Sequence, residues 1–99
     1  MVEEIIWSPL AVQTYDNIIE YLLNNFGEVA VKRFVQHIDD KLKLIASRPA
    51  MFRVTGKRSN TYITSIRKKT TLTYRYDPAK KQVELVVFWG MQDLIKRPD

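Results

Sequence analysis

The sequence contains no cysteine, a single histidine and only three glycines. Without cysteine there can be no disulfide and no thiolate metal site, and nothing points to an oxidising compartment. The lone histidine, His37, has no second cluster of metal-ligating residues beside it, so we expect no metal centre and a surface or packing role for it. The glycines form no phosphate-binding loop, and no serine lies in a triad signature. We therefore expect no cofactor.

Long apolar runs are also missing, and none approaches the length that spans a bilayer. The first four residues, Met1 to Glu4, are acidic at their end and differ from the basic-then-apolar pattern of a signal peptide. We therefore expect a cytoplasmic protein. With 99 residues, of which 45% are hydrophobic, the chain is expected to fold as a single domain over residues 1–99.

Positive charge is unevenly distributed along the chain. Residues 1–50 hold five basic side chains against seven acidic ones, whereas residues 51–99 hold eleven basic side chains against four acidic ones. A one-sided basic surface suggests an anionic partner, either nucleic acid or an acidic protein segment. The alternative is that the basic residues only keep strand edges soluble. The charge pattern alone leaves both interpretations open.

The stretch 71–89 predicts two strands joined by a tight turn. Apolar and polar residues alternate in 71–76, which is the period of a half-buried strand. Asp77-Pro78 then favours a turn, because proline fixes the backbone angle that the turn needs. The second strand becomes apolar on both faces near its end, which is typical of a central, covered strand. On this interpretation its residues Val83, Leu85, Val87 and Trp89 share one face.

Two helices are predicted, over residues 9–26 and 28–47. Ser8 is a good N-cap and Pro9 is well tolerated at the first helical position. Gly27 separates the helices and Pro49 ends the second, so they should form an antiparallel pair. Their apolar residues recur three and four positions apart. The first stripe is Ala11, Tyr15, Ile18, Ile19, Leu22 and Phe26; the second is Val31, Val35, Ile38, Leu42 and Ile45, widened by Ala30, Phe34 and Leu44.

The remaining segments complete an α+β fold. Residues 2–7 and 61–67 read as strands, and residues 50–60 read as a basic loop. The order is then β-α-α-β-β-β: an N-terminal strand, an antiparallel helical hairpin and a mainly antiparallel sheet with the hairpin on one face. The predicted strands are 2–7, 61–67, 70–77 and 82–89. The residues predicted to be buried include Val35, Ile38, Leu42, Leu72, Tyr74, Leu85 and Val87.

In order and spacing, these elements resemble the RelE/ParE superfamily of toxins from bacterial type II toxin–antitoxin modules. The resemblance covers nearly the whole chain and is carried by no single motif. It rests on Trp7-Ser8-Pro9, Ala11, Ile18 to Leu22, Phe26-Gly27, Phe34, Ile38 to Ile45 ahead of Arg48-Pro49, Leu72 to Tyr76 and Val83 to Trp89.

The resemblance implies a cytoplasmic toxin, of the kind linked to plasmid stabilisation, that a cognate antitoxin neutralises. RelE-like members cut mRNA on the ribosome with basic residues of the central strands and a C-terminal tyrosine or histidine, whereas ParE-like members inhibit DNA gyrase. Here Ile63, Ser65 and Thr71 stand near positions that are basic in nuclease members, and no tyrosine or histidine follows Trp89. These departures favour the gyrase-binding function, with no metal or membrane involved.

Three alternatives stay open: an mRNA endonuclease acting on the ribosome, a degenerate relative without toxicity, and a small nucleic-acid-binding module or scaffold. Whether the protein is an enzyme is therefore undecided from the sequence; for a nuclease, the candidate catalytic residues are Arg67, Lys68 and Arg75. The antitoxin is expected to be an acidic, partly disordered segment that adds an amphipathic helix or a strand. The candidates for binding the antitoxin or the target are Arg53, Lys57, Arg58, Arg67, Lys68, Lys69 and Arg75.

Overall fold

The computed structural model describes residues 2–54, 60–67 and 70–90, apart from the side chains of Arg53 and Arg67. The predicted bounds of both helices and of the last three strands are confirmed. The first strand begins two residues later than predicted, and a short additional strand lies within the predicted loop 50–60. The elements are β1 (Glu4–Trp7), α1 (Pro9–Phe26), α2 (Glu28–Ser47), β2 (Arg53–Val54), β3 (Thr61–Arg67), β4 (Thr70–Asp77) and β5 (Gln82–Trp89).

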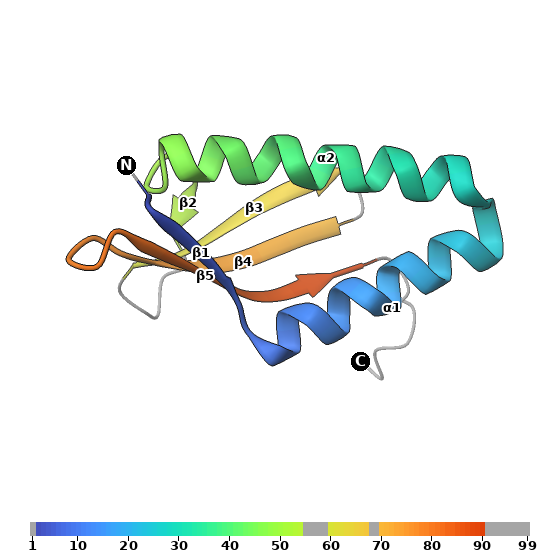
Figure 1. The fold of residues 1–99 in the computed structure, drawn as a ribbon, viewed down its shortest axis with the longest axis horizontal. Coiled ribbons are helices and arrows are strands. Elements are labelled where there is room, and N and C mark those ends of the chain that lie inside the picture. The colour runs from blue at the N-terminus through green and yellow to red at the C-terminus, as the bar shows by residue number, and fades with distance from the viewer. Residues whose placement is uncertain (1, 55–59, 68–69, 91–99) are drawn as a thin grey trace.

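The strands form one five-stranded sheet in the order β1-β5-β4-β3-β2. β1 is parallel to β5, and the other neighbours are antiparallel. A parallel pair needs a long crossover connection, and part of that connection here is the helical hairpin. The sequence therefore predicted the α+β class, the mainly antiparallel sheet and the internal position of the β4–β5 hairpin correctly (Figure 1).

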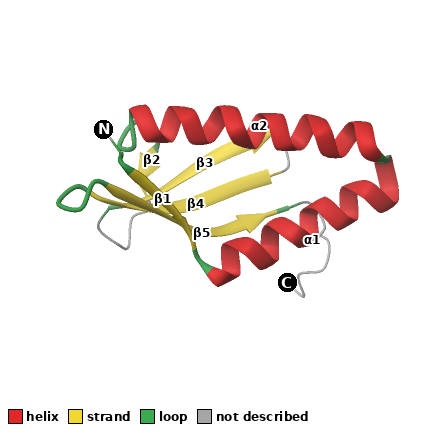
Figure 2. Ribbon diagram, in the orientation of Figure 1, coloured by secondary structure: helices red, strands yellow, loops and turns green. Residues whose placement is uncertain are grey.

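The helices begin and end where local chemistry requires. The Ser8 side chain accepts a hydrogen bond from the Ala11 N–H at 3.0 Å, which caps α1. Gly27 has a φ of 87°, a backbone conformation that favours glycine, and its N–H bonds the carbonyls of Leu22 and Leu23. The chain therefore reverses within one residue, and the two helices diverge from this point (Figure 2). No helix in the described ranges is long and apolar enough to cross a membrane.

The core lies between the hairpin and one face of the sheet. Its helical side is formed by Ala11, Ile18, Phe34, Ile38 and Ile45, and its sheet side includes Leu72, Tyr74, Val83, Leu85 and Phe88. The prediction that Val35 and Leu42 are buried was wrong, because both are only half-buried. Phe34, Ile38 and Ile45 define the centre of the α2 stripe, and Val35, one position after Phe34, lies about 100° around the helix from it.

A β-bulge in β5 overturns the predicted face of that strand. Thr73 pairs with Val87, but its neighbour Tyr74 pairs with Leu85, so Val86 is an extra residue. Phe88 therefore points into the core, and Val87 and Trp89 do not share the face of Leu85, contrary to prediction. Val87 is nevertheless buried, as predicted, whereas Trp89 is 40% exposed.

The backbone of the bulge is bound by hydroxyl groups from the start of α1. Ser8 Oγ donates to the Val86 carbonyl at 2.8 Å, and Thr14 Oγ1 accepts from the Phe88 N–H at 3.0 Å. β1 pairs with β5 only as far as Leu85, so α1 provides hydrogen bonds where the edge strand has ended. The N-cap residue of α1 thus also binds the bulge of β5.

Candidate functional site

The face of the sheet that points away from the helices, called the outer face here, carries the exposed side chains of the central strands. Strand register places its residues in four cross-strand rows. The rows are Asp77–Gln82–Glu4, Thr61–Arg75–Glu84–Ile6, Ile63–Thr73–Val87 and Ser65–Thr71–Trp89, and Arg53 of β2 pairs with Ile63 at the edge of the third row. Apart from Arg53, whose side chain is not described, the charged residues lie in the first two rows, so the described part of this face is a polar and apolar surface with charge at one end.

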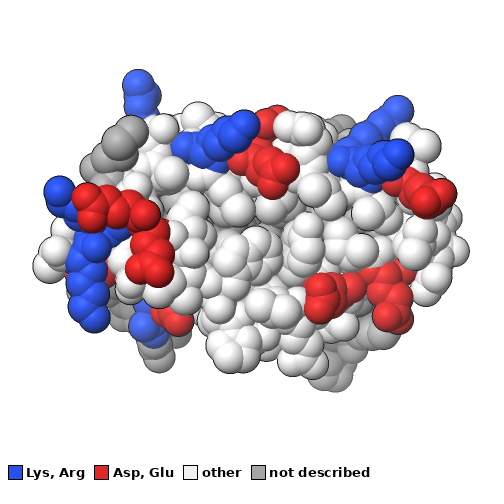
Figure 3. Space-filling model, in the orientation of Figure 1, with Lys and Arg blue, Asp and Glu red and all other residues white. Residues whose placement is uncertain are grey.

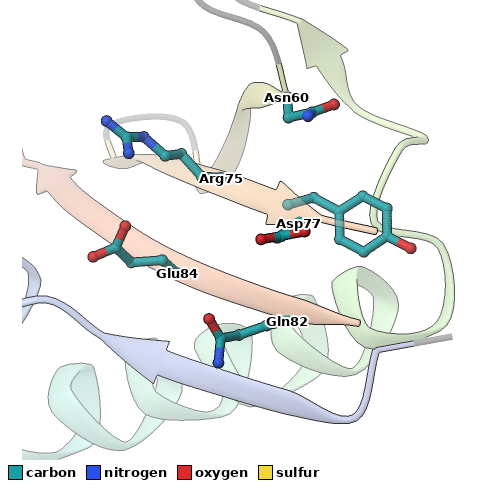
Figure 4. Close-up of a pocket in the computed structure, with 6 residues that line it drawn as sticks. Asn60, Arg75, Asp77, Gln82 and Glu84 are labelled. Atoms are coloured by element: carbon teal, nitrogen blue, oxygen red, sulfur yellow. The ribbon is translucent and has the colours of Figure 1, made fainter. Parts of the chain in front are cut away.

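At that charged end lies a cavity of about 340 Å³, called the Arg75 pocket here. Its lining comes from both sides of the β4–β5 turn and from the residue before β3 (Figure 4). Asp77 Oδ1 accepts hydrogen bonds from the N–H groups of Ala79 and Lys80, which confirms the predicted turn at Asp77-Pro78. The pocket is lined by Asn60, Arg75, Tyr76, Asp77, Gln82 and Glu84.

Two local contacts hold the rim of the Arg75 pocket. Asn60 has a φ of 59°, and its carbonyl accepts from the Tyr76 N–H at 2.9 Å. Gln82 Nε2 donates to Glu4 Oε1 at 3.1 Å and so ties the pocket to β1. Because Asn60 and Gln82 are brought together by strand pairing and not by sequence spacing, a pattern search along the chain could not find this site.

The electrostatics of the Arg75 pocket do not favour a polyanion. Arg75 is exposed, and it lies directly opposite Glu84 across the β4–β5 pair. No ion pair joins Arg75 to Glu84, and within the described residues the only ion pair is that of Lys81 with Glu3, at 4.0 Å. Arg75 can therefore bind an external acceptor. Its charge is outweighed locally, however, by the two carboxylates of Asp77 and Glu84.

The predicted basic cluster is only partly described. Arg75 lies in the pocket, and the backbones of Arg53 and Arg67 lie in β2 and at the end of β3. Arg67 pairs with Thr70, five residues along β4 from Arg75, which corresponds to about 17 Å. Arg67 and Arg75 are therefore at opposite ends of the sheet, not in one site. Lys57, Arg58, Lys68 and Lys69 lie outside the described residues.

Among the described residues, the groups beside Arg75 that could transfer a proton are the carboxylates of Asp77 and Glu84 and the Tyr76 hydroxyl, and no histidine lies there. His37 is exposed on α2, and no cluster of metal-ligating residues occurs within the described ranges. Tyr74 is in the core: its hydroxyl donates to the Pro49 carbonyl at 2.6 Å and its ring stacks on Tyr62. Burial, and secondarily Tyr62, raises the pKa of the Tyr74 hydroxyl, so this group is a packing element, as the sequence predicted.

A second surface is formed by the helices. Figure 3 shows that Lys, Arg, Asp and Glu side chains lie toward the ends and margins of one face, and that its middle is uncharged. In the same orientation, α1 and α2 border this uncharged region (Figure 1). Several apolar residues of the two helices are only half-buried: Tyr15, Ile19, Leu22, Val31, Val35 and Leu42. The two predicted core stripes are incompletely buried, and this incomplete burial indicates an apolar surface on the helices. The sequence pattern alone does not predict it, because it does not show how much of each stripe the sheet covers.

Comparison with known proteins agrees with this fold. Residues 5–92 match the family described as the ParE toxin of the type II toxin–antitoxin system parDE. A solved chromosomal ParDE system from P. aeruginosa is similar in structure, with a TM-score of 0.72 and 13% identity over 91% of this chain and 96% of that one. No curated protein matches the sequence.

Two further solved structures extend the comparison. A YoeB/ParE toxin from Agrobacterium tumefaciens has a TM-score of 0.63 and 15% identity over 89% of this chain and 98% of that one. A YoeB–YefM complex from Staphylococcus aureus has a TM-score of 0.56 and 20% identity over 90% of this chain and 95% of that one. The fold is thus that of the RelE/ParE superfamily of toxins. Within it, the chain belongs to the ParE toxin family of type II toxin–antitoxin systems.

Proposed function

We propose that this protein is a cytoplasmic toxin that inhibits growth by binding an essential protein target, DNA gyrase by family resemblance, and that a cognate antitoxin neutralises it. The observation that carries the proposal is the composition of the outer face. Among its described side chains the one arginine, Arg75, is outweighed by Asp77 and Glu84 at the pocket, and the rows beyond the pocket carry threonine, serine, isoleucine, valine and tryptophan. Such a surface suits protein recognition.

RNA cleavage makes different demands on a site. A phosphoryl transition state carries negative charge that must be stabilised by cations or hydrogen-bond donors, and a proton must be moved by a positioned acid or base. The two carboxylates at the Arg75 pocket oppose the first requirement. For the second, the described residues beside Arg75 offer the carboxylates of Asp77 and Glu84 and the Tyr76 hydroxyl but no histidine, because His37 lies on α2.

Expression of the toxin without its antitoxin tests this proposal. If gyrase is the target, we expect cell filamentation and DNA-damage signalling while transcripts stay intact. Rapid loss of translation with cleaved transcripts would overturn the proposal in favour of a nuclease. An absence of any growth defect would indicate a degenerate relative or one of the binding modules.

The second candidate function is ribosome-dependent mRNA cleavage. One observation favours it: Arg75 is exposed and has no ion-pair partner in the described part of the chain, so it could contact a phosphate. Arg67 and Lys68 are the other candidate residues. If this function is correct, replacing Arg67, Lys68 and Arg75 by alanine should abolish transcript cleavage while the fold, followed by circular dichroism, persists.

For the antitoxin, we propose an acidic segment that folds onto the toxin. The uncharged surface bordered by α1 and α2 offers apolar contacts, and the basic second half of the chain offers charge. Charge contacts weaken as salt screens them, whereas buried apolar contacts do not. Replacing Arg67, Lys68 and Lys69 by alanine should therefore lower both the affinity for the antitoxin encoded beside this gene and its dependence on salt. Unchanged affinity and salt dependence would remove this cluster from the antitoxin site.

A further inference from the structure

The turn between the two helices presents an apolar surface that the core does not use. We call it the tip patch: Leu23, Phe26 and Val29, which are 48%, 64% and 62% exposed. Phe26 continues the spacing of the buried α1 residues and was predicted to pack with them. In Figure 1, however, the end of the hairpin extends past the ends of β3, β4 and β5, so there is no sheet beneath this residue.

The tip patch contributes little to the fold. Its three residues do not belong to the core cluster or to the residues packed against it, and the Phe26 ring contacts the Tyr21 ring of its own helix, with centroids 6.2 Å apart. A Cβ placed on the neighbouring Gly27 would meet no atom within 4 Å, so the turn is open on that side. Exposed apolar residues at adjacent positions of a hairpin tip carry a solubility cost, and a cluster of them marks an interaction site.

The charges around the tip patch argue against a nucleic acid or a strongly acidic segment as its partner. Glu20 precedes the patch in the sequence, Glu28 lies within it between Phe26 and Val29, and Lys32 and Arg33 follow Val29 by about one turn. These four exposed residues carry two charges of each sign, so the neighbourhood has no net charge. Attraction of a polyanion needs an excess of positive charge.

The size of the tip patch argues against a second copy of the chain. Three partly exposed side chains offer roughly 300 Å², against about 800 Å² per partner in a stable interface. An aromatic residue at the centre of a small projecting patch is instead suited to insertion into an apolar socket on a larger protein. We propose that the tip patch docks into such a socket on the target protein of the toxin. This inference depends on the proposed function, in which the target is a protein.

The test replaces the tip patch by Leu23→Gln, Phe26→Gln and Val29→Gln, with glutamine chosen because it is polar and favours helix. The matched control is Leu44→Gln, also an exposed apolar residue of α2 but far from the turn. Circular dichroism and affinity for the antitoxin report folding. Growth arrest in cells and inhibition of purified gyrase report target binding.

We expect the tip variant to bind antitoxin like the unsubstituted toxin and to need about tenfold or more protein for growth arrest and gyrase inhibition. The Leu44→Gln control should match the unsubstituted toxin in every assay. Undiminished growth arrest by the tip variant would overturn the inference. An equal loss of antitoxin affinity in the tip variant would also overturn it, because the patch would then belong to the antitoxin interface. A toxin dimer that dissociates in the tip variant but not in the control would overturn it as well, because the patch would then bind a second copy.

The same assays separate failure of the inference from failure of the proposed function. If the unsubstituted toxin leaves gyrase active while growth arrest still requires the tip patch, gyrase is the wrong target and the docking surface stands. If the unsubstituted toxin inhibits gyrase and the tip variant inhibits it equally, the proposed function stands and the docking surface is wrong.

Discussion

Leu72, Tyr74 and Leu85, on the helix-covered face of the sheet, are fully buried, whereas Arg75 and Trp89, on the outer face of the same strands, are exposed. The backbone is common to both faces, and strand alternation together with the bulge in β5 decides which face each residue joins, although Thr61 and Val87 are buried on the outer face as well. Mutations on the inner face should therefore act through stability, and mutations on the outer face through recognition. The following predictions test that division.

The largest loss of stability is expected from the inner face. Leu72→Ala and Leu85→Ala should each reduce the free energy of unfolding by about 2–5 kcal/mol, because each leaves a cavity in a fully buried site. Leu42→Ala should cost less, since Leu42 is half-buried. Urea unfolding at neutral pH measures these changes. Equal losses for Leu85→Ala and for the exposed control Leu44→Ala would show that the core is misassigned.

Removal of the buried tyrosine hydroxyl should have the next largest effect. Tyr74→Phe leaves the Pro49 carbonyl without its 2.6 Å donor and should cost about 1–3 kcal/mol. Tyr76→Phe is the matched control, because Tyr76 is only half-buried. If both variants unfold at the same denaturant concentration as the parent, the Tyr74 hydrogen bond does not hold the segment after α2 against the sheet.

The same hydroxyl predicts a dependence on alkaline pH. Burial raises the folded-state pKa of Tyr74 above the unfolded value of about 10, so the unfolded chain releases this proton first. The stability contributed by the protonated hydroxyl is thus fully present below about pH 10 and is lost as the pH rises beyond it. The stability difference between the parent and Tyr74→Phe should shrink between pH 8 and pH 11. A constant difference would contradict the assigned burial.

The bulge in β5 should depend on hydroxyl groups from α1. Thr14→Val removes the acceptor of the Phe88 N–H and should cost about 1 kcal/mol, whereas Thr14→Ser keeps the hydroxyl and should cost less. Amide hydrogen exchange at Phe88 should accelerate in the valine variant alone. Equal exchange in the two variants would mean that the bulge does not rely on Thr14.

The smallest effect on stability is expected on the outer face. Arg75→Ala should change the free energy of unfolding by no more than about 0.5 kcal/mol, because the side chain is exposed and has no ion pair in the described residues. Growth arrest should be retained if the target binds elsewhere. A stable Arg75→Ala variant that no longer arrests growth would place the Arg75 pocket in the toxic activity.

The sequence predicted the elements well because their signals are local. Ser8-Pro9, Gly27 and Pro49 set the helix bounds, and Asp77-Pro78 sets the turn. Which face of a helix or strand is buried was less predictable, because burial depends on the element that packs against that face. Phe26 has core spacing but no sheet beneath it, and the Val86 bulge reverses the orientation of the residues that follow.

The candidate sites were harder to predict than the fold. A count of basic residues identified Arg75, but not Asn60 or Gln82, which reach the same pocket through strand register. The carboxylates of Asp77 and Glu84 offset the positive charge of Arg75 at the pocket. Their proximity to Arg75 cannot be read from the order of residues along the chain. The tip patch was hidden for the opposite reason, because its central residue, Phe26, has the spacing of a core residue until the extent of the sheet is known.

The most direct test of the proposed function is a DNA supercoiling assay with purified gyrase and purified toxin, run beside a ribosome-bound transcript in the same buffer. We expect supercoiling to stop as the toxin is added, to resume when the antitoxin is added, and the transcript to stay intact. Undisturbed supercoiling together with a cleaved transcript would contradict the account.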